Sequence, residues 1–185
     1  MIGVLPKSLE VDGKEYEINS DFRTVLVIFQ AYNDPELTDF EKMEVCLQCI
    51  YKERPKNVEA ALEKAMWFLD GGDMPKSKQA PVKIMDWEYD QSMYFPAVNK
   101  AAGYETREVE YLHWWSFLGL FNEIPEGLYS QVMNIRSKRA KGKKLEKYEV
   151  EFYNDHKELI NIKEKLTEEE LAQEQADLEF INSLI

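Results

Sequence analysis

The amino-acid sequence predicts a mostly α-helical protein that opens with one short β-hairpin. Residues 9–18 alternate apolar and polar side chains around Asp12-Gly13, a strong signal for a hairpin turn. From Phe22 onward, the apolar residues recur with a period near 3.6, which is typical of amphipathic helices. With 185 residues, 44% of them apolar, the chain is long enough to bury a substantial core.

The first two helices are marked by capping residues. The first should begin at Phe22, with Ser20 as its cap, and should end at residues 33–35. The second should begin after Thr38, because Thr38 and Glu41 have the spacing of a capping box. Its apolar stripe should face the core and consists of Phe40, Met43, Leu47 and Ile50.

The middle of the chain should hold two more helices. Asn57 can cap a third helix, which Gly71-Gly72 should end. Residues 73–81 contain two prolines, two lysines and no apolar period, so we expect an exposed loop there. A fourth helix should begin near Asp86, with Pro96 bending or ending it.

The second half should continue as helices. A fifth helix should start at Thr106, after Gly103, and should carry Trp114-Trp115. A sixth should run over about 125–140 and a seventh over about 145–160, and Thr167 opens an eighth with a second capping box. We therefore expect a helical domain over residues 1–162, followed by a C-terminal acidic amphipathic helix or arm over residues 163–185.

The two adjacent tryptophans lie in an aromatic segment that is too short and too interrupted to span a bilayer. Neighbouring residues of a helix point about 100° apart, so the two indoles should not face the same core element. We expect one indole inside the fold and the other in a groove or subunit contact.

Two patterns invite a metal or catalytic interpretation. Cys46 and Cys49 form a C-x-x-C pair, but no further ligands lie at short spacing, so packing is the favoured role. His113 lies in no recognisable catalytic context, and we expect packing and one hydrogen bond to hold it. Asp86 and Asp90 could share a divalent cation, although solvated helix caps are favoured. The sequence predicts no enzyme, no cofactor and no metal.

Charge is distributed unevenly along the chain. The net charge of −12 argues against a protein that covers nucleic acid over its whole surface. Residues 136–147 nevertheless hold seven basic residues and one acidic residue, whereas residues 148–185 hold three basic and eleven acidic residues. The basic cluster could contact phosphates, but no aromatic residue interleaves it. A solvated or protein-facing basic turn is therefore favoured over a nucleic-acid site.

The last segment carries a narrow apolar stripe on an acidic background. Leu171, Leu178 and Ile185 are seven residues apart, with Ile181 between them. Such a stripe can dock on one partner helix but is too narrow to be buried on all sides. Packing on its own domain and capture by another subunit or a client both remain open. The N-terminus lacks a basic leader and a long apolar stretch, so we expect the protein in the cytoplasm of its host.

Several of these segments together resemble a known family. The aromatic residues 112–121, read with residues 86–90, Gly103-Tyr104 and the N-terminal residues 5–23, are similar to the bacteriophage "gene product fifteen" family of long-tailed phages and prophages of Gram-positive bacteria. That family is in turn similar to phage tail-assembly chaperones. The resemblance implies binding to the tape-measure protein, contact with the major tail tube protein, and self-association. The short aromatic segment and the net charge, not the resemblance, argue against a membrane partner and favour a protein partner over nucleic acid.

We expect the partner-binding side chains in three groups, namely the aromatic segment, the basic cluster and the last apolar stripe. These are Trp114, Trp115, Phe117, Arg136, Lys138, Arg139, Lys141, Lys143, Lys144, Leu171, Leu178 and Ile181. The alternatives are a structural component of the tail or neck that stays in the virion, and a nucleic-acid-binding accessory protein.

Overall fold

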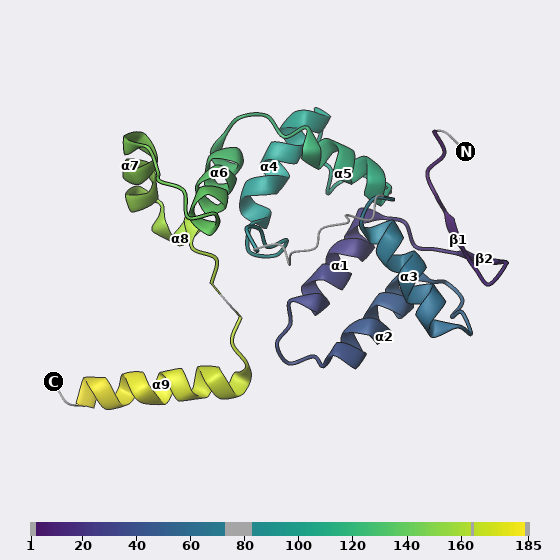
Figure 1. The fold of residues 1–185 in the computed structure, drawn as a ribbon, viewed down its shortest axis with the longest axis horizontal. Helices are drawn as coiled ribbons and strands as arrows, with labels where there is room; N and C mark the ends of the chain where they lie inside the picture. The colour runs from purple at the N-terminus through teal and green to yellow at the C-terminus, as the bar shows by residue number, and fades with distance from the viewer. Residues whose placement is uncertain (1–2, 73–82, 164, 184–185) are drawn as a thin grey trace.

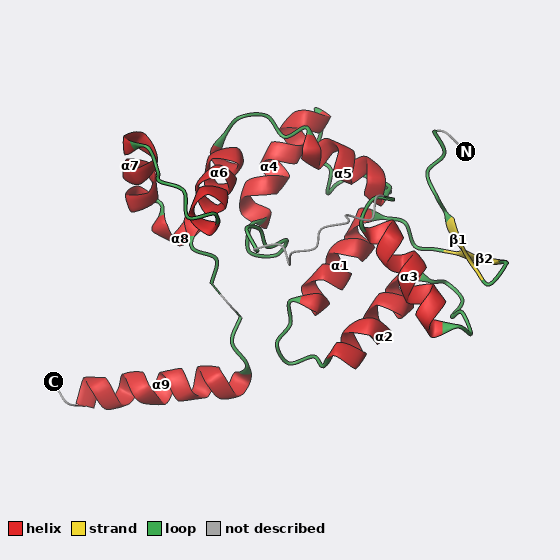
Figure 2. Cartoon of the chain, in the orientation of Figure 1, coloured by secondary structure: helices red, strands yellow, loops and turns green. Residues whose placement is uncertain are grey.

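A computed structural model describes residues 3–72, 83–163 and 165–183. It confirms a mostly helical chain with one N-terminal two-stranded antiparallel sheet (Figure 2). The expected loop at residues 73–81 lies outside the described residues. Within the described residues, no helix is both long enough and apolar enough to cross a membrane.

The hairpin pairs β1 (Ser8–Val11) with β2 (Lys14–Glu17) in the register Ser8 to Glu17. Asp12 and Gly13 both have positive φ angles, of 51° and 77°, as the tight turn between twisted strands requires. The strand residues Leu9, Val11 and Tyr16 are buried, and β1 packs against α3 (Val58–Leu69). The predicted hairpin is therefore confirmed.

Two further helices complete the N-terminal layer, α1 (Phe22–Tyr32) and α2 (Asp39–Ile50), with α2 packed between α1 and α3 (Figure 1). The capping box at Thr38 and the cap at Asn57 are confirmed. The predicted cap of α1 is wrong. Asp21, not Ser20, accepts the hydrogen bond from the Arg23 backbone N–H, at 2.9 Å. The Ser20 hydroxyl instead bonds the Tyr111 hydroxyl at 2.7 Å.

The apolar stripe predicted for α2 is buried only in part. Burial along this helix begins at Cys46 and includes Leu47 and Ile50. Phe40 and Met43 belong to the first turns and are exposed, Phe40 by 66%. Periodicity gives the direction in which a side chain points but not whether another element covers it. These two residues thus extend the stripe beyond the core.

The C-terminal half of the domain begins with α4 (Gln91–Ala102) and α5 (Trp114–Asn122), both of which start later than predicted. Residues 87–90 form a turn ahead of α4, and Pro96 lies inside the helix, which continues to Gly103 at φ 78°. Thr106 does not start α5, because its backbone N–H and its hydroxyl both donate to Asn99 Oδ1 on α4.

The segment before α5 is held instead by the start of α1. The Arg23 guanidinium donates to the carbonyl groups of Arg107 and Val109, and Asp21 accepts the Leu112 N–H at 3.0 Å. Backbone groups that a longer helix would have paired internally are therefore committed to α1. As a result, α5 cannot begin before His113.

The remaining helices are α6 (Leu128–Ala140), α7 (Lys147–Asp155), α8 (Lys157–Ile160) and α9 (Glu168–Ser183). The single helix predicted over 145–160 is thus split at His156 into α7 and α8. The capping box at Thr167 is confirmed, because its hydroxyl accepts the Glu170 N–H and the Glu170 carboxylate accepts the Thr167 N–H. In Figure 1, α9 lies apart from the other helices.

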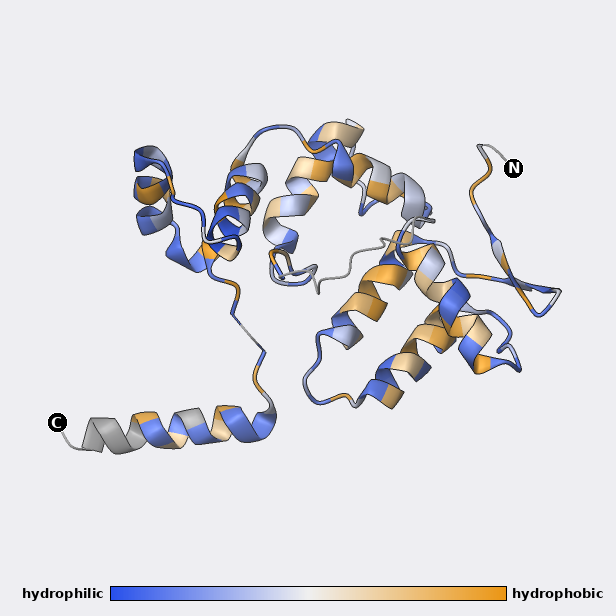
Figure 3. Cartoon of the chain, viewed as in Figure 1, coloured by the Kyte–Doolittle hydropathy of each residue, from blue (hydrophilic) through white to orange (hydrophobic). Residues whose placement is uncertain are grey.

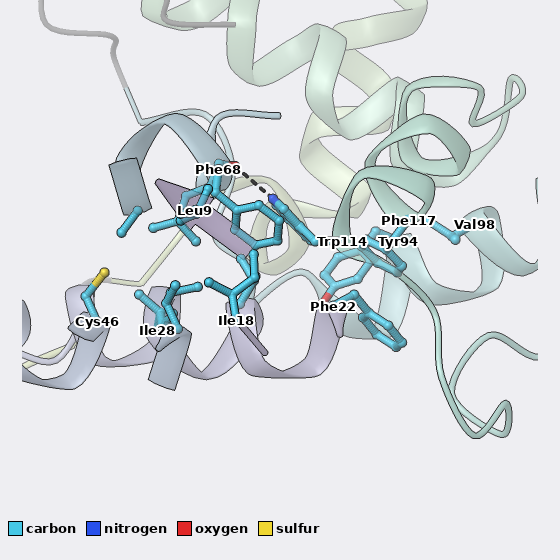
Figure 4. Close-up of a cluster of buried hydrophobic side chains, with 14 of the residues drawn as sticks. Leu9, Ile18, Phe22, Ile28, Cys46, Phe68, Tyr94, Val98, Trp114 and Phe117 are labelled. Atoms are coloured by element: carbon cyan, nitrogen blue, oxygen red, sulfur yellow. Dashed lines mark hydrogen bonds between the residues drawn. The ribbon is translucent and has the colours of Figure 1, made fainter. Parts of the chain in front are cut away.

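The core is dominated by aromatic rings that join the two halves (Figure 4). Phe22 of α1 stacks on Phe117 of α5, with ring centroids 4.5 Å apart. The centroid of the Trp114 ring lies 5.8 Å from that of Phe29 and 5.7 Å from that of Trp87. Such rings each bury a large apolar area, so this cluster supplies much of the stabilisation of the fold.

Candidate protein-interaction surfaces

The adjacent indoles of Trp114 and Trp115 both bond the last turn of α3. Trp114 Nε1–H donates to the Leu69 carbonyl, and Trp115 Nε1–H donates to the Phe68 carbonyl, each at 2.9 Å. The last carbonyl groups of a helix lack the usual intrahelical partners. The Trp114 indole supplies a donor to the Leu69 carbonyl, and the Trp115 indole adds a second donor to the Phe68 carbonyl, which also accepts the Gly71 N–H at 3.2 Å. The expectation that the two indoles face different elements is therefore wrong, although their burial differs. Trp114 is 1% exposed, whereas Trp115 is partly buried.

His113 is buried and serves as the N-cap of α5. Its Nδ1 accepts the Trp115 backbone N–H at 3.0 Å, so the hydrogen lies on Nε2, which donates to the Pro6 carbonyl at 2.9 Å. Burial lowers the pKa of His113, the Pro6 hydrogen bond opposes this effect, and the nearby Lys7 adds to it. The predicted structural role is confirmed, with two hydrogen bonds rather than one.

The C-x-x-C pair lies within α2. Cys46 is part of the buried core (Figure 4). Cys49 is partly buried against that core. Burial raises the pKa of both thiols, which keeps them protonated at neutral pH and weakly reactive. The packing role predicted for these residues is confirmed.

Asp90 and Arg136 form a buried ion pair that the sequence did not reveal. Arg136 Nη1 and Nη2 lie 2.7 and 2.9 Å from the two carboxylate oxygens of Asp90, a bidentate geometry. The guanidinium also donates to the carbonyl groups of Ile84, Leu159 and Ile160, so all five of its N–H groups are used. This one side chain therefore joins α6 to α4 and to the end of α8.

Asp86 and Asp90 were predicted to be solvent-exposed helix caps. The predicted exposure is wrong, because both residues are buried. Asp86 does cap the turn that follows it, accepting the N–H groups of Glu88 and Tyr89 at 2.9 Å, and it pairs with Lys83 at 2.7 Å. Among the residues that the structure describes, no group of three or more His, Cys, Asp or Glu side chains could hold a metal ion.

Three of the expected partner-binding side chains lie inside the domain. Trp114 and Phe117 belong to the aromatic core, and Arg136 is committed to Asp90. Their burial prevents direct contact with a partner, which corrects the expectation that they form part of the surface. The aromatic mass that marked them in the sequence is what makes them core residues.

The basic cluster divides into two parts. Lys138 pairs with the buried Glu149 of α7 at 2.6 Å, and this contact lowers the pKa of the Glu149 carboxyl. Arg139 donates to Asn161 Oδ1 at 2.6 Å and lies over the Tyr153 ring. These two side chains tie α6 to the elements that follow it, with Lys138 partly buried and Arg139 exposed.

Three further lysines of the cluster lie in the connection between α6 and α7. Residues 141–144, which we call the basic turn, contain Lys141, Lys143 and Lys144 around Gly142, whose φ is 63°. All three lysines are exposed, and within the described residues no ion pair joins them to another side chain. They form a concentrated, accessible positive charge.

The last helix contacts the rest of the chain mainly at its start. The Glu168 N–H donates to the Glu36 carboxylate at 2.6 Å, and just before the helix Lys165 pairs with Glu88 at 2.5 Å. Leu171 and Leu178 are both exposed. Ile181, the third expected contact residue, has a side chain outside those that the structure describes. Figure 3 shows isolated apolar residues on the otherwise hydrophilic described part of α9.

Comparison with protein families gives a match over most of the chain. A family model described as "Bacteriophage Gp15 protein" matches residues 1–162. The chain belongs to this bacteriophage family. Neither the search of curated proteins nor the search of solved structures gives a match. The matched segment includes the basic turn and ends before α9.

Within the segment matched to the Gp15 family lies an apolar surface that includes Phe40 and Met43, two residues of the predicted apolar stripe of α2. The Tyr32 hydroxyl lies 3.9 Å from Met66 Sδ of α3 and also contacts the Cys46 thiol of α2. On the apolar stripe of α2, Met43 and Phe40 precede Cys46 and are exposed, as is Met66. We call Tyr32, Phe40, Met43 and Met66 the methionine surface. Only its exposure, which depends on tertiary packing, distinguishes it from core.

Proposed function

We propose that this protein is a tail-assembly chaperone that binds the tape-measure protein of its phage and keeps it soluble in the host cytoplasm. Membership of a bacteriophage family supports the part of this proposal that makes the chain a phage protein. The observation that most supports the binding role is the methionine surface, whose Phe40, Met43 and Met66 side chains are exposed and whose Met66 Sδ lies 3.9 Å from the Tyr32 hydroxyl.

The chemistry of this surface suits an apolar helix as its client. A tape-measure protein is long and largely helical, and its apolar stripes are exposed until the tail tube encloses them. Methionine side chains are flexible and polarizable, so they adapt to differing apolar partners. An amphipathic helix can therefore lie across Phe40, Met43 and Met66 without a strict sequence requirement.

The charge of the chain suits a holdase role. With a net charge of −12, each bound copy adds negative charge to the complex, and like-charged complexes repel one another. Each copy needs only weak affinity, because many copies along one client act together. Tail tube subunits would then displace the copies as the tube closes, which makes the major tail tube protein a second, transient partner.

The test is co-expression with the tape-measure protein from the same phage. The native chain should raise the soluble fraction of the client and co-purify with it. The variant Phe40→Ser, Met43→Ser should lose most of this effect, because it removes two exposed apolar contacts while the buried part of α2 stays intact. The matched control is Tyr104→Ser, Leu128→Ser, which removes two other exposed apolar side chains and should retain the effect.

Two outcomes would contradict the proposal. If the client is equally insoluble with and without this chain, and mature virions contain the protein, it is a structural component of the tail or neck. If the control variant loses the effect as fully as the methionine-surface variant, binding does not depend on the methionine surface.

A further inference from the structure

The described parts of this chain contain an acidic region and a basic region that are not in contact with each other. Residues 168–183 of α9 contain six acidic residues and no lysine or arginine. The basic turn presents Lys141, Lys143 and Lys144 to solvent, and Lys147 at the start of α7 is exposed as well. The acidic residues of α9 and the lysines of the basic turn would attract one another at contact distance, and salt would screen that attraction.

Apolar side chains accompany both charged regions. On α9, Leu171 and Leu178 are exposed and lie two helical turns apart on one face. Beside the basic turn, Tyr148 of α7 is 64% exposed. Each region thus combines charge with an uncovered apolar group, the composition of a small protein–protein contact.

The arrangement of the chain directs α9 away from its own basic turn. Its first residue is bonded to Glu36, in the connection between α1 and α2, and Lys165 just before it is paired with Glu88. In Figure 1, α9 runs clear of α6 and α7, the helices that flank the basic turn. The acidic helix is therefore placed to reach a neighbouring molecule.

We propose that α9 of one copy docks on the basic turn of a second copy of this chain, with its acidic side chains against Lys141, Lys143 and Lys144 and its leucines against Tyr148. The two surfaces of this contact differ, so the contact is head-to-tail. Repeated head-to-tail contacts close into rings or extend into chains. This inference concerns self-association and is independent of the proposed client.

The test uses charge reversal in the full-length chain. One variant, the turn variant, carries Lys141→Glu, Lys143→Glu and Lys144→Glu. The other, the helix variant, carries Glu168→Lys, Glu169→Lys and Asp177→Lys, which leave the Thr167–Glu170 capping box intact. Sedimentation velocity at low salt measures the assembly of each variant alone, of the two mixed, and of the native chain at low and high salt.

The native chain should associate at low salt and dissociate at high salt. Each variant alone should associate at least about tenfold more weakly, because three pairs become repulsive. An equimolar mixture should recover the assembly, since each surface then meets its complement on the other chain. The matched control, Lys56→Glu, Lys64→Glu and Lys100→Glu, reverses three exposed lysines elsewhere and should associate like the native chain.

Two results would overturn the inference. A native chain that stays monomeric at low salt excludes the contact between copies. Variants that associate like the native chain, or a mixture that does not recover when each variant alone is impaired, also exclude it. Circular dichroism of each variant establishes that it is folded. Client solubility is measured in a separate assay. A negative result for self-association therefore does not contradict the chaperone proposal, and a negative result for client solubility does not contradict self-association.

Discussion

At the scale of single residues, the Arg136 guanidinium is a buried charge that is fully hydrogen-bonded. It is buried, and each of its five N–H groups has an acceptor on Asp90 or on the backbone of Ile84, Leu159 or Ile160. A lysine carries only three N–H donors and cannot make the bidentate contact. A substitution here therefore leaves buried acceptors without donors.

The first prediction follows from this geometry. Arg136→Lys should lower the free energy of unfolding by about 2 to 4 kcal/mol, measured by urea denaturation. Arg139→Lys is the matched control on the same helix. Its partner Asn161 is exposed, so its loss should stay below about 1 kcal/mol. Equal losses for the two variants would mean that the buried pair does not stabilise the helical packing.

The second prediction concerns the pH dependence of stability through His113. Burial lowers the pKa of His113 below the ordinary value of 6.5, so the unfolded chain binds this proton first as the pH falls. The contribution to stability is complete above pH 6.5 and is lost as the pH falls from there to the folded-state pKa. Protonation would also remove the Nδ1 acceptor that caps α5.

His113→Asn tests this dependence, because asparagine can accept the Trp115 N–H but does not titrate. Between about pH 7.5 and pH 5.5, the unfolding free energy of the native chain should fall more steeply than that of the variant. Urea denaturation across this range measures both slopes. Identical slopes would show that His113 does not link stability to pH.

At the scale of elements, the junction of α3 and α5 depends on a glycine. Gly72 has φ 89°, and a Cβ atom placed there would lie 2.8 Å from the Trp115 ring. Gly103, after α4, has φ 78° but no atom within 4 Å of such a Cβ. Both glycines therefore have a positive φ angle, but only Gly72 lies against an aromatic ring, that of Trp115.

The third prediction uses this matched pair. Gly103→Ala should cost about 1 to 2 kcal/mol of unfolding free energy, the strain of a left-handed backbone. Gly72→Ala should cost about 1 to 2 kcal/mol more, because Trp115 must move and weaken its bond to the Phe68 carbonyl. Thermal or urea denaturation measures both. Equal costs would indicate that the indole adjusts freely.

The elements that sequence reasoning predicted correctly are those with local signals. The Asp12-Gly13 turn and the caps at Thr38, Asn57 and Thr167 depend on residues within a few positions of one another. The start of α5 could not be predicted in this way. It is fixed by bonds from Asp21 and Arg23, more than 80 residues earlier in the chain.

The same distinction applies to the candidate surfaces. Periodicity marked Phe40 and Met43 as apolar positions of α2 but could not show that no element covers them. Aromatic content marked Trp114 and Phe117 as important but could not distinguish core from surface. Asp90 and Arg136 are 46 residues apart, and no local pattern connects them. Lys141, Lys143 and Lys144 are exposed, and their charge density is visible in the sequence itself.

At the scale of the whole molecule, the packing of the chain changes close to the residue at which the family match ends. The family match ends at residue 162, and the described hydrogen bonds of α9 to other elements are confined to its start. Its described leucines are exposed, so the helix buries little apolar surface on its own chain. Stability should therefore reside in the domain, whereas α9 should contribute to association.

The fourth prediction separates these two contributions by deletion of residues 167–185. Measured at high salt, where association is weak, the unfolding free energy should change by less than about 1 kcal/mol, because the one hydrogen bond to another element described for α9 is an exposed contact to Glu36. At low salt the truncated chain should sediment as a monomer where the native chain assembles. A large loss of stability at high salt would instead mean that Leu171 and Leu178 pack on the domain in solution, which would make α9 an integral helix of the fold.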